Sequence, residues 1–144
     1  MNNLEEQAWE IANRIHKNCV RKVSNKPYIT HIQNVVNIIN KWDIRSPTII
    51  IPAILHDSVE GSKERGIIIK EIGQKFGEYI KKVVLLLTHD EGYDYMDYIK
   101  ELSDNRDATI VKIADILDNL TDNPTVNQKL KYKEALVYLL GKKV

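Results

Sequence analysis

Cysteine is nearly missing from this chain of 144 residues, where Cys19 is the only one. A disulfide within the chain is therefore impossible, which excludes a fold stapled by such bonds and fits a reducing compartment. The first residues have neither the basic nor the apolar region of a signal peptide, and no apolar run reaches the length that spans a membrane. These absences predict a cytoplasmic protein that has no membrane partner.

An excess of charge of one sign is missing as well. Lysine and arginine number 21, aspartate and glutamate number 20, and the formal net charge is +1. A dedicated nucleic-acid-binding domain usually carries a basic stripe, so this balance argues against a nucleic acid as the partner. The length is that of one ordinary domain, and such a chain buries roughly 68–70% of the surface that its unfolded form exposes. We therefore expect a single domain over residues 1–144.

Alternating strand patterns and linkers rich in glycine, proline or serine are also absent. Apolar residues recur instead at helical spacing, as Ala8, Ile11 and Ile15 do near the N-terminus. Ser46 followed by Pro47 is typical of the start of a helix. The pattern predicts an all-α bundle with helices over residues 4–15, 28–42, 47–59, 67–76, 78–87, 95–102, 108–120 and 128–140.

Two histidines and two aspartates stand out because apolar sequence surrounds each of them. His56 and Asp57 end a long apolar run, His31 lies early in a predicted helix, and Asp115 has apolar residues on both sides. Burial of an imidazole or a carboxylate is costly unless a partner compensates it, and a metal ion is one such partner. A lone buried histidine is more often a hydrogen-bonded core residue, and Asp115 could instead pair with Lys112. The four together nevertheless favour a mixed nitrogen and oxygen site for a divalent cation.

Helical spacing places two further polar side chains beside this predicted site. Glu60 lies one turn after His56, where a carboxylate could orient or deprotonate a water. Asn119 lies one turn after Asp115 and could hold a substrate group. An open coordination position for water or a phosphate oxygen distinguishes a catalytic metal site from a closed structural one.

Two other histidines are not predicted to be metal ligands. His89 precedes a turn, so its ring is expected to bond free carbonyls at the end of a helix. His16 has no acidic neighbour and is predicted to lie on the surface or in a wall of the substrate cleft. Three tyrosines are expected in the core or at the edge of a pocket, namely Tyr93, Tyr95 and Tyr98.

The order of these residues, His then His-Asp then Asp, resembles the pattern of the HD superfamily of metal-dependent phosphohydrolases. The local sequence is most similar to the hydrolase domains of RelA/SpoT-type enzymes and to stand-alone small alarmone hydrolases. The three matching blocks are PYITH at 27–31, AILHDSVE at 53–60 and VKIADILDNL at 111–120. The resemblance runs over nearly the whole chain and implies an all-α bundle that prefers Mn²⁺. The implied metal ligands are His31, His56, Asp57 and Asp115.

The resemblance also implies an activity on a small nucleotide. The family removes the 3′-pyrophosphate from guanosine tetra- and pentaphosphate, (p)ppGpp, and some stand-alone relatives remove the 2′-phosphate of NADPH. By position, Glu60 resembles the first residue of a Glu-Asp pair of the family that helps to activate the attacking water. Asp57 is expected to orient that water together with Glu60. Arg21, Lys22 and Asn119 fall where the family contacts the nucleotide. Lys26, in the same basic loop as Arg21, is expected to meet phosphate charge.

One departure from the family divides the hypotheses. The Glu-Asp pair of the family reads Glu60-Gly61 here, so a carboxylate that would serve as acid or base is lost. The first hypothesis is a metal-dependent phosphohydrolase, and the alternative is a catalytically impaired nucleotide sensor that keeps the metal. A purely structural bundle would bind neither metal nor nucleotide. The sequence leaves the nucleotide, the metal and a homo-oligomeric state open.

Overall fold

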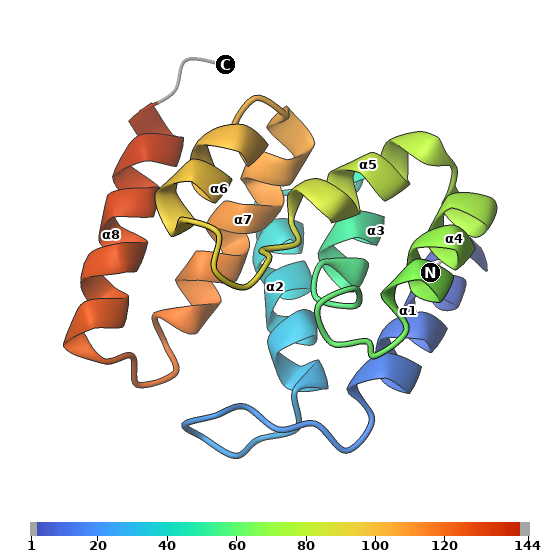
Figure 1. Cartoon of the computed structure of the whole chain (residues 1–144), viewed down its shortest axis with the longest axis horizontal. Helices are drawn as coiled ribbons and strands as arrows, with labels where there is room; N and C mark the ends of the chain where they lie inside the picture. The colour runs from blue at the N-terminus through green and yellow to red at the C-terminus, as the bar shows by residue number, and fades with distance from the viewer. Residues whose placement is uncertain (1–2, 142–144) are drawn as a thin grey trace.

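The computed structural model describes residues 3–141, and within this range the chain forms helices joined by loops (Figure 1). The helices are α1 (Asn3–His16), α2 (Ile29–Lys41), α3 (Pro47–Leu55), α4 (Arg65–Phe76), α5 (Glu78–Leu86), α6 (Tyr95–Leu102), α7 (Arg106–Asn119) and α8 (Val126–Gly141). The described residues contain no strand beyond an isolated bridge between Val20 and Pro27. The predicted all-α fold is thereby confirmed. No helix in this part of the chain combines the length and the apolar character that crossing a membrane requires.

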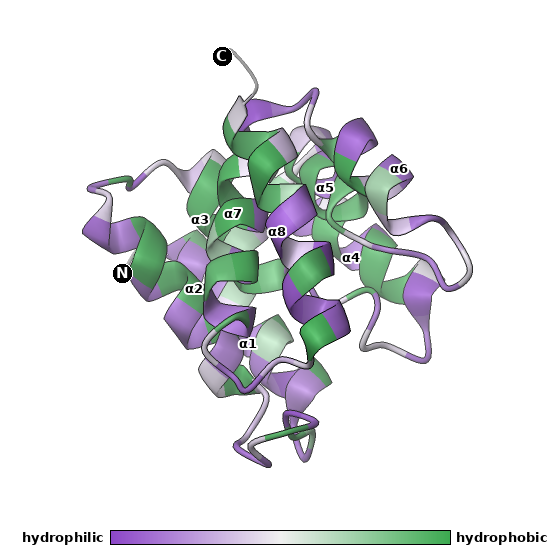
Figure 2. Ribbon diagram, turned by 90° about the vertical axis from the view of Figure 1, so that its left-hand side faces the viewer, coloured by the Kyte–Doolittle hydropathy of each residue, from purple (hydrophilic) through white to green (hydrophobic). Residues whose placement is uncertain are grey.

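Helix α3 lies at the centre of the fold because it is apolar on every side. All residues from 49 to 55 are buried, and α3 packs against α1, α2, α5 and α7. In Figure 2 the ribbon is hydrophobic where the helices face one another in the middle of the bundle. The segment that follows α3 therefore starts inside the core.

The end of α3 differs from the prediction. The helix was expected to reach about residue 59, but it ends at Leu55 and residues 56–60 form turns. Nδ1 of His56 lies 2.6 Å from the carbonyl oxygen of Ala53, the oxygen that the amide of Asp57 would bond in a continuing helix. The side chain of His56 thus takes the place of a backbone donor, and the chain can turn there.

Helices α2 and α7 pack against each other and against α3. Their buried faces include Val35 and Ile39 in α2 and Val111 and Ala114 in α7. This packing brings the first turn of α2 close to the C-terminal half of α7. Helix α8 lies at one edge of the molecule, where it packs against α6 and α7 (Figure 1).

Replacing Ile54 by alanine tests whether α3 forms the centre of the core. Ile54 is fully buried, so Ile54→Ala should leave a cavity and lower the free energy of unfolding by about 2–5 kcal/mol. Urea denaturation followed by circular dichroism measures the change. Ile67→Ala is the control, because Ile67 is 62% exposed and its truncation should cost less than about 0.5 kcal/mol. Equal losses in the two variants would contradict this view of the core.

Candidate metal centre and its cleft

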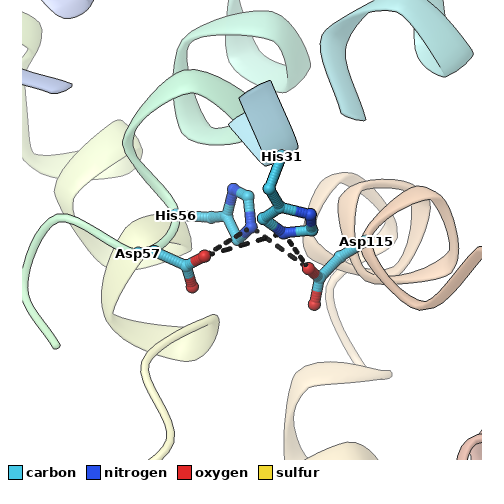
Figure 3. Close-up of side chains that lie close together, drawn as sticks. All are labelled: His31, His56, Asp57 and Asp115. Atoms are coloured by element: carbon cyan, nitrogen blue, oxygen red, sulfur yellow. Dashed lines mark hydrogen bonds and ion pairs between the residues drawn. The ribbon is translucent and has the colours of Figure 1, made fainter. Parts of the chain in front are cut away.

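The structure brings together the four side chains that the sequence predicts as metal ligands (Figure 3). His31 comes from the first turn of α2, His56 and Asp57 directly follow α3, and Asp115 belongs to α7. One ligand atom from each lies within 4.8 Å of all the others. The close approaches include 2.8 Å between His31 Nε2 and Asp115 Oδ1 and 3.2 Å between His56 Nε2 and Asp57 Oδ2. Three segments far apart in sequence thus present two nitrogens and two carboxylates to one point.

Hydrogen bonds fix the orientation of both imidazole rings. Nδ1 of His56 lies 2.6 Å from the carbonyl oxygen of Ala53, and Nδ1 of His31 lies 2.7 Å from Oδ2 of Asp118. A carbonyl or an ionised carboxylate can only accept, so each neutral ring keeps its proton on Nδ1 and leaves the lone pair of Nε2 for the cluster. Histidines that bind metals in proteins commonly donate the N–H of their other ring nitrogen to a carbonyl or carboxylate in this way. The arrangement therefore fits a metal ion.

Burial and charge act against each other on the two histidines. Burial alone would lower the pKa of His31, but its hydrogen bonds with Asp115 and Asp118 outweigh this cost and raise the pKa. Burial would also lower the pKa of His56, but the charge of Asp57 and the hydrogen bond with Asp115 raise it well above its usual range. Without a metal, both rings are therefore biased toward holding a second proton.

The two carboxylates shift in the opposite direction. Burial would raise the pKa of Asp57, but the charge of His56 beside it holds that pKa well below its usual range. Burial likewise opposes ionisation of Asp115, and the charge of Lys112 overcomes it, with Lys112 Nζ 2.8 Å from Asp115 Oδ2. A divalent cation that displaced two imidazole protons would leave the total charge of the cluster unchanged. This charge balance also fits a divalent ion.

Asp118 supports the centre although the sequence pattern does not single it out. Its buried carboxylate lies 2.7 Å from His31 Nδ1, and it accepts hydrogen bonds from Arg21 at 2.9 Å and from Asn34 at 3.1 Å. Arg21, which the resemblance assigns to the nucleotide, is only 7% exposed, and its Nε also lies 3.1 Å from Asp122. Carboxylates thus engage much of its charge. The signal that could have found Asp118 is its spacing of three residues from Asp115, which places both on one face of α7.

A cleft of about 490 Å³ opens beside the four clustered side chains. His31 and His56 are each 1% exposed and do not line it. Six of the predicted site residues line this cleft, namely Asp57, Asp115, Glu60, Arg21, Lys22 and Asn119. Lys26 does not line the cleft, although it is exposed on the same loop between α1 and α2 as Lys22.

The cleft also contains cationic and aromatic side chains that were not among the predicted ligands and substrate contacts. Lys112 lies 5.1 Å from the centre of the Tyr98 ring, and Lys131 lies 4.6 Å from the centre of the Tyr95 ring. The hydroxyl of Tyr28 donates to Asp57 Oδ2 at 2.5 Å. Further lining residues are His89, Gln128 and Tyr132. The expectation that tyrosines edge a pocket is thus confirmed for Tyr95 and Tyr98.

The two histidines that were not predicted as ligands, His16 and His89, differ from expectation. His89 lines the cleft, and its Nε2 bonds the carbonyl of Tyr93 in the following loop at 2.7 Å rather than a carbonyl at the end of α5. His16 is 5% exposed and does not line the cleft, so its predicted position is wrong. It lies on the buried face of α1 one turn after Ala12, and its ring packs 4.9 Å from that of Tyr28.

Comparison with known proteins identifies the family. The family model for the HD domain matches residues 8–112, well over half of the chain. The chain belongs to the HD domain family. Its fold is similar to a solved structure of a protein described as a metazoan ortholog of SpoT that hydrolyses ppGpp and plays a role in starvation responses, with a TM-score of 0.81. The two sequences are 23% identical, and the match covers 100% of this chain and 89% of the other.

None of the curated proteins compared with this HD domain matches it. The predicted membership in the HD superfamily is nevertheless confirmed by the family match, and the similarity to the solved structure shows that the two proteins share a fold. The cluster of two histidines and two aspartates is the element of the HD pattern that the geometry assembles.

This HD domain has Glu60 followed by Gly61, where the family resemblance implies two carboxylates in succession. Glu60 lines the cleft, and burial together with the charge of Asp57 raises its pKa. One of its oxygens accepts a hydrogen bond from the backbone amide of His89. At Gly61 a Cβ atom would come within 3.2 Å of the Asp57 carbonyl oxygen and of the His16 ring. Gly61→Asp would therefore crowd the backbone beside Asp57 and is not a simple restoration of the pair.

The Asp118→Ala variant tests whether this carboxylate orients His31. Loss of the partner of Nδ1 should weaken Mn²⁺ binding by about 10–100-fold, although all four predicted ligands remain. Isothermal titration calorimetry measures the affinity, and circular dichroism checks the folding of the variant. Asp122→Ala is the matched control, because Asp122 also pairs with Arg21 but is not the residue that bonds His31. Equal affinities in the two variants would contradict the role of Asp118.

Metal binding should depend on pH in a direction that the histidines set. The pKa values of His31 and His56 are raised, whereas a metal binds neutral imidazole, so binding must expel protons and should tighten as pH rises. For the same reason, the metal-free protein gains stability from its imidazolium groups below the unfolded pKa of about 6.5 and loses it as pH rises through the raised values. Calorimetry in buffers of different ionisation enthalpy counts the released protons. An affinity for Mn²⁺ that stays constant between about pH 5.5 and about pH 8 would contradict this prediction.

Proposed function

We propose that this HD domain is a metal-dependent phosphohydrolase that acts on a small nucleotide. The observation that supports it best is the meeting of two histidines and two aspartates beside a cleft that also contains lysines and tyrosines. A phosphoryl group needs positive charge around it, and a nucleobase needs an aromatic surface. The lysines and tyrosines that line the cleft provide positive charge and aromatic side chains in one place.

The residues that would hold the metal are His31, His56, Asp57 and Asp115. Their nitrogen and oxygen atoms suit an ion of intermediate hardness, and we propose Mn²⁺. Such an ion, when bound, supplies Lewis acidity toward a phosphoryl oxygen and makes a water more acidic. The protein fixes the donors through Asp118 and the Ala53 carbonyl, so the ligand set is oriented before the ion arrives.

Glu60 is the proposed acceptor of the proton of the attacking water. It lines the cleft together with Asp57, and its raised pKa brings a carboxylate closer to the range in which a general base is efficient. The backbone amide of His89 holds one oxygen of Glu60, which restricts the carboxylate and leaves its second oxygen available to the cleft. Asp57 is held in turn by the hydroxyl of Tyr28.

Lys22 and Lys131 are the proposed partners of the phosphate groups. Both line the cleft, and neither is paired with a carboxylate in the part of the chain that the structure describes. Arg21 and Lys112 are less suited, because Asp118 and Asp115 already hold them. Compared with the sequence prediction, this assignment keeps Lys22 and replaces Lys26 by Lys131 of helix α8.

The base and the sugar would lie against the remaining lining residues. Tyr95 and Tyr132 line the cleft, and Asn119 offers an amide next to Asp115. The nucleotides to test first are ppGpp, which the structurally similar metazoan protein is described as hydrolysing, and NADPH. Each joins phosphate groups to a purine nucleoside.

Gly61 favours a second candidate function. The missing carboxylate would have served proton transfer, and a side chain at position 61 would be crowded, because its Cβ would come within 3.2 Å of the Asp57 carbonyl oxygen and of the His16 ring. A nucleotide sensor that binds metal and ligand but turns over slowly is therefore the alternative. Both candidates require the same metal centre, so only turnover separates them.

Incubation with Mn²⁺ and a panel of ppGpp, NADPH and ordinary nucleotides tests the proposal through release of phosphate or pyrophosphate. We expect turnover of at least one nucleotide, and Glu60→Gln should lower kcat by about 10²–10⁴-fold. Glu10→Gln is the matched control, because Glu10 is exposed on α1 and does not line the cleft. His56→Ala should lose the bound metal in elemental analysis and the thermal shift that Mn²⁺ produces. Binding without turnover would favour the sensor, and absence of both metal and nucleotide binding would contradict both candidates.

A further inference from the structure

Helix α8 is apolar on two opposite faces. Its inner face packs against α6 and α7 through the buried Ala135 and Leu139. A surface helix that packs only through its inner face normally has a polar outer face. The outer face of α8 instead exposes Val126 by 71%, Leu130 by 61%, Val137 by 66% and Leu140 by 66%. Figure 2 shows α8 toward the viewer with hydrophobic stretches along it.

The exposed residues follow a regular spacing. Together with Lys133 they lie at steps of four, three, four and three residues, and we call this set (Val126, Leu130, Lys133, Val137 and Leu140) the outer stripe. At about 100° per residue, the five side chains fall within about 40° of one line along the helix. Steps of four and three are the a and d positions with which one helix pairs with another. The spacing therefore indicates a helix as the partner of the outer stripe.

We propose that the outer stripe is the contact of a homodimer in which the α8 helices of two copies pair in parallel. The charges beside the stripe support a second copy as the partner. Lys129 and Glu134 lie on opposite edges of the stripe, at the positions that face each other across a parallel pair of helices. Two-fold symmetry would form this Lys-Glu pair twice. In an antiparallel pair, like edges would meet, and no lysine would face a glutamate.

We expect a dimer of low affinity whose formation costs little conformational entropy. Two heptads are short for a free-standing coiled coil, but α8 is already folded against α6 and α7, so its pairing orders little additional chain. Lys133 would face its own copy in the middle of the stripe, which lowers the affinity. A single pair of helices also buries an area at the low end for specific interfaces. Dimerisation is therefore expected at micromolar or higher concentrations.

The dimer would also restrain one wall of the cleft. Lys131 and Tyr132 line the cleft from α8, so a partner bound to the outer face would restrain one wall of the site. The dimer itself does not rest on the proposed function, because it needs only the folded α8.

Sedimentation velocity over a concentration series from about 1 µM to about 500 µM tests the proposal. The protein should pass from a monomer of 16.7 kDa to twice that mass. Leu130→Glu should abolish the dimer, whereas Ile67→Glu should leave it intact, because Ile67 is as exposed as Leu130 but lies on α4. Lys133→Leu should shift dimerisation to concentrations lower by about tenfold or more, which a folding defect would not produce.

Charge exchange tests the parallel direction. Lys129→Glu and Glu134→Lys should each weaken the dimer, and the double variant should restore it. A double variant that is no better than either single one would overturn the parallel pairing. A protein that stays monomeric throughout, or a dimer that Leu130→Glu leaves intact, would overturn the dimer and assign the outer stripe to another partner.

Discussion

Two buried imidazoles held among carboxylates are the interaction on which the rest of this structure depends. His31 and His56 each fix one ring nitrogen to a partner outside the cluster and direct the other toward Asp57 and Asp115. Charges buried together are costly unless each is compensated, and here protons or a divalent cation can provide the compensation. Because α2, α7 and the end of α3 each contribute, the same contacts that form the site also join the central helices.

The position of α3 explains how this cluster reaches the cleft. A helix that is apolar on every side must lie inside the bundle, so its C-terminal end delivers His56 and Asp57 to the interior. His56 then bonds the Ala53 carbonyl and ends the helix, which turns the chain toward the surface. Glu60 follows within the same turns and lines the cleft. The fold thus separates two buried histidines from the carboxylates of Asp57, Glu60 and Asp115, which line the cleft.

The opposite charges of the site come from different parts of the chain. The acidic groups follow α3 or belong to α7, whereas Lys22 lies in the loop after α1 and Lys131 on α8. Lys112 stands between them, bound to Asp115 and close to the ring of Tyr98. The proposed phosphate partners, Lys22 and Lys131, are thereby separate from the carboxylates of the cluster. Lys112, in contrast, already pairs with Asp115.

The sequence by itself determined the helical fold and the four residues of the cluster, because apolar periodicity and isolated polar residues in apolar surroundings are local signals. It also placed Asn119, which lies one helical turn after Asp115 in α7. Glu60 lines the cleft as well, although residues 56–60 form turns and not the helix from which its position was predicted. Only the tertiary structure decided that Lys131 lines the cleft and that Lys26 does not, that Arg21 is held by Asp118, and that His16 is buried behind Tyr28. The physical reason is that these facts depend on how α1, α7 and α8 pack around α3. Contacts between segments so far apart in sequence leave no periodic trace in any one of them.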